Sequence, residues 1–318
     1  MYTKLVLKRV LFIIVFCCLT GLSFAWDTRI RQYLYTPSNQ ENPFLLRDSA
    51  LHTVDPSLET KIIIHGFFEN ADRYWLRNIR RAYFERGNYN VILVDWSYWA
   101  IWRPFNAINN IPNVGLDVGD AILKLVSSQA LDIKKVHIVG FSMGAHAAGF
   151  AGQRVYESLG TKITRITSLD GVGQYYKDVN DTERLSSDDA DYVDVVHTSW
   201  VGRHDPYGTV DYYVNGKNFQ KGCPDILTFE RRSIFTFLID AVINLVACSH
   251  ERSHAYFIES INCKGITGTS CSSRDNFDKG LCKENTKTIF GEDAPVKDLG
   301  GLFYVTTNQH SPFNTSAC

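Results

Sequence analysis

The chain has 318 residues, of which 45% are hydrophobic and 21% charged, and its formal net charge at pH 7 is −1. This length is enough for a large buried core and is compatible with one large α/β domain or two smaller ones. The near-neutral charge, without any polybasic run, argues against nucleic-acid binding, because phosphate contacts require a surplus of lysine and arginine.

The N-terminal segment has the composition of a secretory signal peptide. Basic residues precede an apolar stretch over 10–22, and the small-x-small sequence Ser-Phe-Ala follows at 23–25. This order of charged, apolar and small residues is typical of export signals. The apolar stretch is shorter than the roughly 20 residues that cross a bilayer, and no later segment is long and uncharged enough. We therefore expect a signal peptide at 1–25, a secreted chain over 26–318 and no transmembrane segment.

From residue 61 onward, apolar runs alternate with helical patterns. Five runs are predicted strands, namely KIIIHG, NVILVDW, KVHIVG, ITRITSLDG and DVVHTSW, and helical patterns at 72–87, 114–129 and 143–158 lie between them. Strand and helix in alternation predict a parallel sheet, and β-branched runs are typical of strands covered on both faces. No repeat or proline-rich linker divides the chain. We predict one α/β domain with a mostly parallel central sheet and helices on both faces.

Ser142 lies in Gly-Phe-Ser-Met-Gly, directly between a predicted strand and a predicted helix. Such a motif arises by chance, and only the strand-turn-helix context separates a nucleophile elbow from an ordinary turn serine. Gly140 and Gly144 permit a strained turn and close helix packing. The Met143 N–H, at the helix start, would point at a developing oxyanion. We predict Ser142 as a nucleophile and Met143 as one oxyanion donor.

A nucleophilic serine requires an orienting carboxylate and a base, which follow it in the chain of α/β-hydrolases in the order acid, then histidine. Asp170 follows the next predicted strand, whereas Asp189, Asp191 and Asp194 precede or lie within a later one. The alternative role for Asp170 is a turn or a helix cap. We predict that Asp170 is the acid.

His197, His204, His250 and His254 follow Asp170 as candidates, and His250 is the predicted base. It stands two residues after Cys248, where a disulfide would fix the chain that presents the imidazole. His254 shares its helical face and is the nearest alternative, while His197 ends a strand and is more easily explained as structural.

Phe67 follows the strand KIIIHG and is the second predicted oxyanion donor, through its backbone N–H. The alternative, that Phe67 and Phe68 pack in the core, does not exclude this backbone role.

Six cysteines remain after the signal peptide, all in the last third of the chain: Cys223, Cys248, Cys263, Cys271, Cys282 and Cys318. An even number without a CxxC pair, in an exported chain, favours disulfides over zinc. Cysteine spacing alone leaves several pairings open. Two sequons, at Asn180 and Asn314, fit a secreted glycoprotein.

Taken together, these segments resemble the secreted animal lipase family, which includes pancreatic lipase, lipoprotein lipase, the phospholipases A1 and the insect yolk proteins. The matching segments run in order over 60–313: IIIHGF, VDWS, VHIVGFSMGAHAAGFAG, DYVDVVHT, DYYVNGKNFQKGC, ACSHERSHAYFIESI and YVTTNQHSPF. The resemblance implies an α/β-hydrolase fold, a triad of Ser142, Asp170 and His250, and oxyanion amides at Phe67 and Met143. We predict no cofactor.

The resemblance also implies the disulfides Cys223–Cys248 and Cys271–Cys282, which leaves Cys263 with Cys318. The first would clip a lid over 224–247, whose apolar residues recur at helical spacing: Phe235, Leu238, Ile239, Val242 and Ile243. A clipped apolar segment that opens would expose its surface to a lipid–water interface. The alternative is a helix permanently buried on the sheet.

The chain departs from the family pattern at several places. Phe141 precedes the nucleophile where histidine is usual, and Gly171 follows Asp170 where a proline-containing turn is common. The family's calcium loop corresponds only partly to 181–189, with Ser186 where an acid is usual, so we predict no metal. We also expect no C-terminal β-sandwich domain.

The lid and the loop before YYVNG give opposite indications of the substrate. In the family, phospholipases A1 tend to have a short lid and a short loop, and triacylglycerol lipases tend to have a long lid and a long loop. Here the lid is long, whereas the loop over 199–211 is short. We expect a secreted ester hydrolase of neutral glycerolipids, with phospholipase A1 as the alternative. A non-catalytic lipid-binding role, as in yolk proteins, usually accompanies loss of the nucleophile, and all three triad residues are present here.

Overall fold

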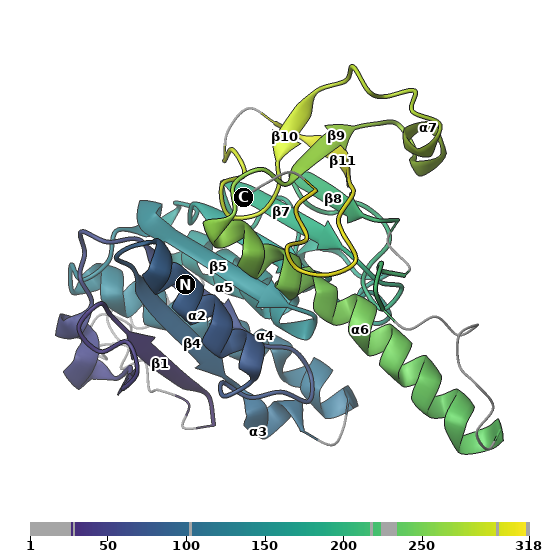
Figure 1. The fold of residues 1–318 in the computed structure, drawn as a ribbon. Helices are drawn as coiled ribbons and strands as arrows, with labels where there is room; N and C mark the ends of the chain where they lie inside the picture. The colour runs from purple at the N-terminus through teal and green to yellow at the C-terminus, as the bar shows by residue number, and fades with distance from the viewer. Residues whose placement is uncertain are drawn as a thin grey trace, which may run out of the picture.

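The computed structural model describes Asp27 and residues 29–101, 104–216, 219–223, 234–296 and 299–315, with the side chains of 234–246 excepted. Within these residues one sheet has the strand order β10-β9-β11-β8-β7-β6-β5-β3-β4-β1-β2 (Figure 1). The expected signal peptide at 1–25 and Cys318 lie outside the described residues.

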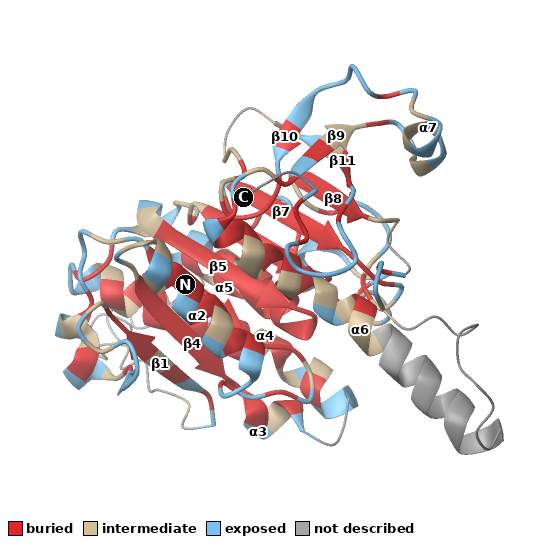
Figure 2. Ribbon diagram, viewed as in Figure 1, coloured by how far each residue is buried: buried red, intermediate tan, exposed pale blue. Residues whose placement is uncertain are grey.

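The centre of the sheet is parallel, from β4 through β3, β5, β6, β7 and β8 to β11. The parallel strands are β3 (Thr60–Ile64), β4 (Asn90–Asp95), β5 (Val136–Phe141), β6 (Arg165–Leu169), β7 (Tyr192–His197), β8 (Val210–Val214) and β11 (Gly301–Val305). Every residue of β3 to β8 is buried, as β-branched runs with both faces covered require (Figure 2). This arrangement confirms the predicted α/β fold.

Short antiparallel strands extend the sheet at both edges. β1 (Arg31–Tyr35) and β2 (Phe44–Leu45) continue it beyond β4, while β9 (Thr267–Ser270) and β10 (Lys287–Ile289) continue it beyond β11. These edge strands were not among the sequence predictions.

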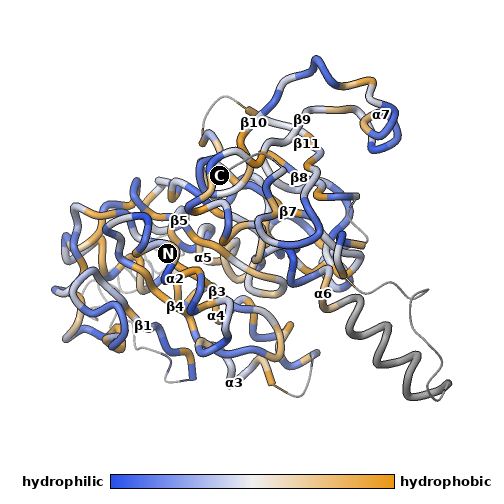
Figure 3. The backbone as a smooth tube through the Cα atoms, in the orientation of Figure 1, coloured by the Kyte–Doolittle hydropathy of each residue, from blue (hydrophilic) through white to orange (hydrophobic). Residues whose placement is uncertain are grey.

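Helices cover both faces, and the alternation of side chains along β3 separates the two cores. Ile62 and Ile64 pack with α4 (Pro104–Ser127) and α5 (Met143–Leu159). Ile63 packs on the other face with residues of α2 (Tyr74–Arg86) and α6 (Ile234–Asn262). Figure 1 shows these two helices on the same face of the sheet. Figure 3 shows the apolar residues concentrated in these layers, whereas hydrophilic α7 (Arg274–Asp278) stands away from the sheet.

Shorter elements complete the described chain: η1 (Asp48–Thr53), α3 (Ser97–Ala100), η2 (Ile133–Lys135) and η3 (Asp181–Glu183). None of the described helices combines the length and apolar character needed to cross a membrane.

Two disulfides join cysteines of the described chain. Cys223 bonds to Cys248, with Cα atoms 5.8 Å apart, and Cys271 bonds to Cys282, with Cα atoms 5.6 Å apart. The first ties the segment before the expected lid to α6, two residues before His250. Residues 224–233 and the side chains of 234–246 lie outside the described residues, so the lid at 224–247 stays a prediction.

Helix α4 packs against α5 through a glycine. A Cβ atom added at Gly115 would lie only 2.6 Å from the Ala147 carbonyl oxygen and would also overlap the Phe150 side chain. A backbone carbonyl cannot move aside without shifting the helix, so the close approach of α4 and α5 requires the absence of a side chain at this position.

We expect Gly115→Ala to lower the free energy of unfolding by about 1–3 kcal/mol, because the added methyl group overpacks the helix contact. Urea denaturation would measure this change. Gly300→Ala is the matched control, since the nearest atom to a Cβ there is 3.5 Å away. An equal loss in both variants would contradict the packing explanation.

Candidate active site

Ser142 occupies a sharp turn between β5 and α5. Its backbone has φ 55° and ψ −119°, a left-handed conformation that is strained for a residue with a side chain. Two glycines make the turn feasible, because a Cβ at Gly140 would lie 2.7 Å from the Ala145 nitrogen and one at Gly144 would lie 2.5 Å from the His65 oxygen. The turn has the geometry of a nucleophile elbow.

Asp170 follows β6, is almost fully buried and is held by four donors. Its Oδ2 lies 2.6 Å from His250 Nδ1 and also accepts the Ser199 hydroxyl. Its Oδ1 accepts the backbone N–H groups of Thr198 and Ser199, at 2.8 Å and 3.1 Å. The carboxylate therefore has a fixed position from which it can orient one imidazole.

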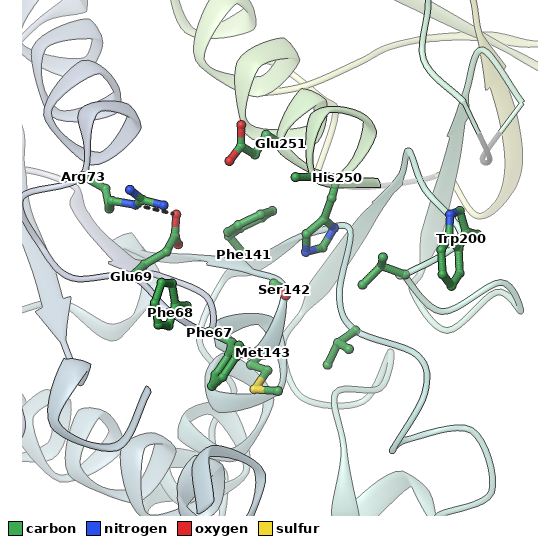
Figure 4. A pocket seen from close by; sticks show the side chains of 13 residues that line it. Phe67, Phe68, Glu69, Arg73, Phe141, Ser142, Met143, Trp200, His250 and Glu251 are labelled. Carbon is green, nitrogen blue, oxygen red and sulfur yellow. Dashed lines mark ion pairs between the residues drawn. The ribbon is translucent and has the colours of Figure 1, made fainter. Parts of the chain in front are cut away.

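His250 lies on α6, and in Figure 4 its imidazole faces Ser142 across the pocket. The ring is partly exposed, and Phe141 packs against it with ring centroids 4.6 Å apart. Because Nδ1 is engaged by Asp170, Nε2 is the ring atom available to a serine hydroxyl.

The other candidate histidines have different surroundings. His254 is buried, stacks on Trp75 at 4.8 Å, and has no hydrogen-bond partner at Nε2 within the described part of the chain. Burial lowers its pKa to about 3, so it stays neutral. Both ring nitrogens of His197 are occupied, by the Arg203 oxygen and by Asp211. His204 is exposed.

The two proposed oxyanion donors, Phe67 and Met143, line the same cavity as Ser142. Met143 is the first residue of α5, so its N–H has no partner within the helix. Phe67 belongs to the loop after β3, and this loop passes so close to the elbow that a Cβ at Gly66 would lie 2.9 Å from Ser142 Cβ. Phe68 beside it is 57% exposed and is not a core residue.

A cavity of about 450 Å³ opens at Ser142, and its walls are mostly apolar (Figure 4). The apolar lining consists of Phe67, Phe68, Phe141, Met143, Val172, Trp200, Val201 and Ala247. The polar lining consists of Ser142, His250, Glu69, Arg73 and Glu251. An apolar pocket with a few convergent polar groups suits a hydrocarbon chain that ends in an ester.

Two residues of this site carry no sequence motif and were missed by sequence reasoning. Ser199 holds the Asp170 carboxylate with its hydroxyl and its N–H. Glu69 is buried beside the loop that contains Phe67 and accepts the Gly66 N–H at 2.8 Å. The only sequence signal was their place at the end of a predicted strand, for Ser199, and just after one, for Glu69.

The two sequons differ in accessibility. Asn180 is exposed at the start of η3, where its side-chain nitrogen donates to Glu183. Asn314 is only 3% exposed, and its side-chain nitrogen lies 3.4 Å from Cys263 Sγ. A glycan at Asn314 would displace this packing, so the burial of Asn314 argues against glycosylation at this sequon.

The segment 181–189 does not fit a calcium ion. Its inward-facing oxygens accept N–H groups from the Gln153 amide, at 3.2 Å for the Arg184 carbonyl and 3.0 Å for Asp189 Oδ1. The Asp181 carboxylate pairs with the Arg184 guanidinium instead of turning inward. Calcium requires six to eight oxygen ligands, whereas here an amide nitrogen stands among the available ones.

A parallel sheet with a serine at a strand-to-helix elbow, followed in the chain by an aspartate and a histidine bonded to each other, defines the α/β-hydrolase class. Within this class the chain belongs to the lipase family, because the family model described as Lipase matches residues 23–313.

The relatives with curated descriptions include triacylglycerol lipases and one protein described as inactive. The hepatic triacylglycerol lipase of Rattus norvegicus is 33% identical, over 86% of this chain and 57% of its own length. The pancreatic triacylglycerol lipase of Cavia porcellus is 32% identical, over 81% and 58%. A human relative described as inactive pancreatic lipase-related protein 1 is 31% identical, over 79% and 56%. The chain thus spans about half the length of these relatives, and family membership alone does not establish activity.

We expect the free energy of unfolding to fall below pH 6.5 in part because of His254. Since its folded-state pKa is about 3, protons bind only the unfolded state between pH 6.5 and 3, and stability is lost as the pH falls through this window. At pH 5 this proton uptake by the unfolded state lowers the free energy of unfolding by about 2 kcal/mol. His254→Phe keeps an aromatic ring on Trp75 and should lose that much less between pH 7.5 and pH 5 in urea denaturation. The exposed His204→Gln serves as control and should behave as wild type.

We also expect that neither EDTA nor millimolar calcium changes the melting temperature of the wild-type protein, because the Gln153 amide stands among the loop oxygens. Differential scanning calorimetry would measure this. Stabilisation of the wild type by calcium would contradict the assignment, whereas stabilisation confined to Gln153→Ala would show that the amide blocks the site.

Proposed function

We propose that the protein is a secreted serine hydrolase that releases fatty acids from glycerolipids. The observation that carries this proposal is the 2.6 Å contact between Asp170 and His250 beside a serine in a strained elbow that opens into an apolar cavity. The lipase family supports a lipolytic ester hydrolase.

In the proposed mechanism, Ser142 Oγ attacks the ester carbonyl carbon and His250 Nε2 takes the serine proton. The N–H groups of Phe67 and Met143 stabilise the oxyanion of the tetrahedral intermediate. His250 then protonates the leaving alcohol, and an acyl-serine remains. Water, deprotonated by the same imidazole, releases the fatty acid, while Asp170 keeps the ring oriented throughout.

Neutral triacylglycerol is the substrate we favour. The apolar cavity walls and two relatives described as triacylglycerol lipases support this choice. The second candidate, phospholipase A1 activity, is favoured by the short connection from β7 to β8, which places the half-exposed Trp200 at the cavity wall.

The remaining expectations belong to the same proposal. Removal of a signal peptide at 1–25 would leave one hydrolase domain over 26–318, with a lid at 224–247 that opens at a lipid–water interface. Disulfides are formed mainly in oxidising compartments, so the two in the described chain agree with export. Asn180 is the sequon whose exposure suits a glycan.

The test compares fatty-acid release by purified protein from a triacylglycerol emulsion and from phosphatidylcholine vesicles, with Ser142→Ala as the blank. We expect the substitution to lower the rate by at least roughly 10³-fold, because it removes the nucleophile. Faster release from the emulsion supports the triacylglycerol assignment, and faster release from phosphatidylcholine supports phospholipase A1. Equal rates for wild type and Ser142→Ala would refute the hydrolase proposal and favour lipid binding without catalysis.

A further inference from the structure

Glu69 is a buried carboxylate that none of the proposed catalytic steps uses. It is 7% exposed and has two hydrogen-bond donors and one ion-pair partner, from its own loop and from the start of α2. Oε2 accepts the Gly66 N–H at 2.8 Å, Oε1 accepts Trp75 Nε1–H at 2.9 Å, and Arg73 Nε lies 3.6 Å from Oε1 (Figure 4). A carboxylate held at both oxygens fixes the groups that it binds.

The Gly66 contact bears directly on the proposed oxyanion donor at Phe67. On one side of Phe67, the Gly66 N–H is held by Glu69; on the other, the Phe68 N–H donates to the Ala100 carbonyl at 2.8 Å. Phe68 has φ 62°, so the loop is held in a strained conformation. Between these two ties, the Phe67 N–H has no acceptor within the described residues.

The Trp75 contact connects the same carboxylate to the helix that carries the proposed base. The Trp75 ring stacks on His254 and meets Phe141 edge to face at 5.6 Å. Phe141 in turn packs against the His250 ring at 4.6 Å. Glu69 thus holds both the loop that contains Phe67 and the ring cluster beneath His250.

We propose that Glu69 is a positioning residue, which fixes the Phe67 N–H relative to Ser142 and to the imidazole of His250. The inference rests on the proposed function, since the Phe67 amide matters only if an oxyanion forms. Its physical basis is that oxyanion stabilisation depends on donors placed in advance within a few tenths of an ångström.

The sign of the charge separates positioning from a direct electrostatic effect. The negative charge of a carboxylate repels a developing oxyanion and so destabilises the transition state. Neutralising Glu69 without moving the loop would therefore accelerate the reaction. Glutamine keeps the shape of glutamate but presents an NH₂ group to one of the two N–H donors, so either the loop contact at Gly66 or the ring contact at Trp75 is lost. A slower reaction in Glu69→Gln therefore reports the loss of position.

The test measures kcat and KM for hydrolysis of p-nitrophenyl butyrate below its solubility limit, with active sites titrated to completion by a fluorophosphonate. We expect Glu69→Gln to lower kcat about 10- to 100-fold and to leave KM within about twofold, because donor placement acts in the transition state. The inhibition constant of butaneboronic acid, which forms a tetrahedral adduct on serine, should rise by the same factor as kcat/KM falls.

Glu292→Gln is the matched control. Glu292 is 9% exposed and accepts Lys61 Nζ at 2.7 Å and the Tyr83 hydroxyl at 2.8 Å, in a network that does not line the Ser142 cavity. Its substitution should lower the melting temperature and leave kcat per active site within about twofold. If Glu69→Gln does not fold, Glu69→Asp, which keeps the charge but is too short to span both donors, should still lower kcat several-fold.

An unchanged kcat and an unchanged boronic acid constant in a folded Glu69 variant would overturn the inference, as would a faster reaction. These outcomes differ from failure of the proposed function, in which the wild type itself would hydrolyse the ester no faster than Ser142→Ala.

Discussion

The backbone conformation of Ser142 is the constraint on which the rest of the site depends. A left-handed conformation is unfavourable for a serine, and contacts from the neighbouring strand hold it there. The Ser142 N–H donates to the Leu169 carbonyl at 3.0 Å, and the Ser142 carbonyl accepts the Val172 N–H at 3.3 Å. Leu169 and Val172 flank Asp170, so the bonds that hold the strained turn also set the place of the carboxylate. The elbow and the acid therefore form one rigid unit, to which α6 adds the imidazole.

The sequence predicted β3 to β7 because each lies in a largely β-branched run, but it did not predict β8 and β11, whose sequences VDYYV and GLFYV hold fewer β-branched residues. It was less informative where burial is one-sided or partial. Helix α4 begins at Pro104, well before the expected 114, because proline suits the first turn of a helix while the apolar periodicity starts later. The edge strands β2 and β10 are short and mostly exposed, so neither leaves a recognisable pattern.

Some residues of the candidate site are recognisable from local sequence, whereas others are defined only by tertiary contacts. Ser142 and Asp170 are recognisable from local context, since each follows a buried strand. Spacing alone could not separate His250 from His254, because residues four apart share one helix face. The difference between them is tertiary: one ring meets Asp170 at the cavity, whereas the other is enclosed by Trp75 and Phe141. Contacts to backbone amides, such as those of Glu69, have no sequence pattern at all.

The buried carboxylate of Asp170, at the carboxyl end of β6, has different partners from the buried charges at the amino ends of β3 and β6. At the amino ends, Lys61 pairs with Glu292 at 2.7 Å and Arg165 pairs with Asp194 at 2.8 Å, so each buried charge already has its counter-charge. At the carboxyl ends, Asp170 is held only by N–H groups, a hydroxyl and an imidazole. A carboxylate paired with a permanent cation has little further attraction to offer, whereas one held by neutral donors stabilises an imidazolium when the ring gains a proton. The ion pairs at the amino ends are therefore already neutralised, whereas the negative charge of Asp170 is available to the imidazolium that forms when His250 gains a proton.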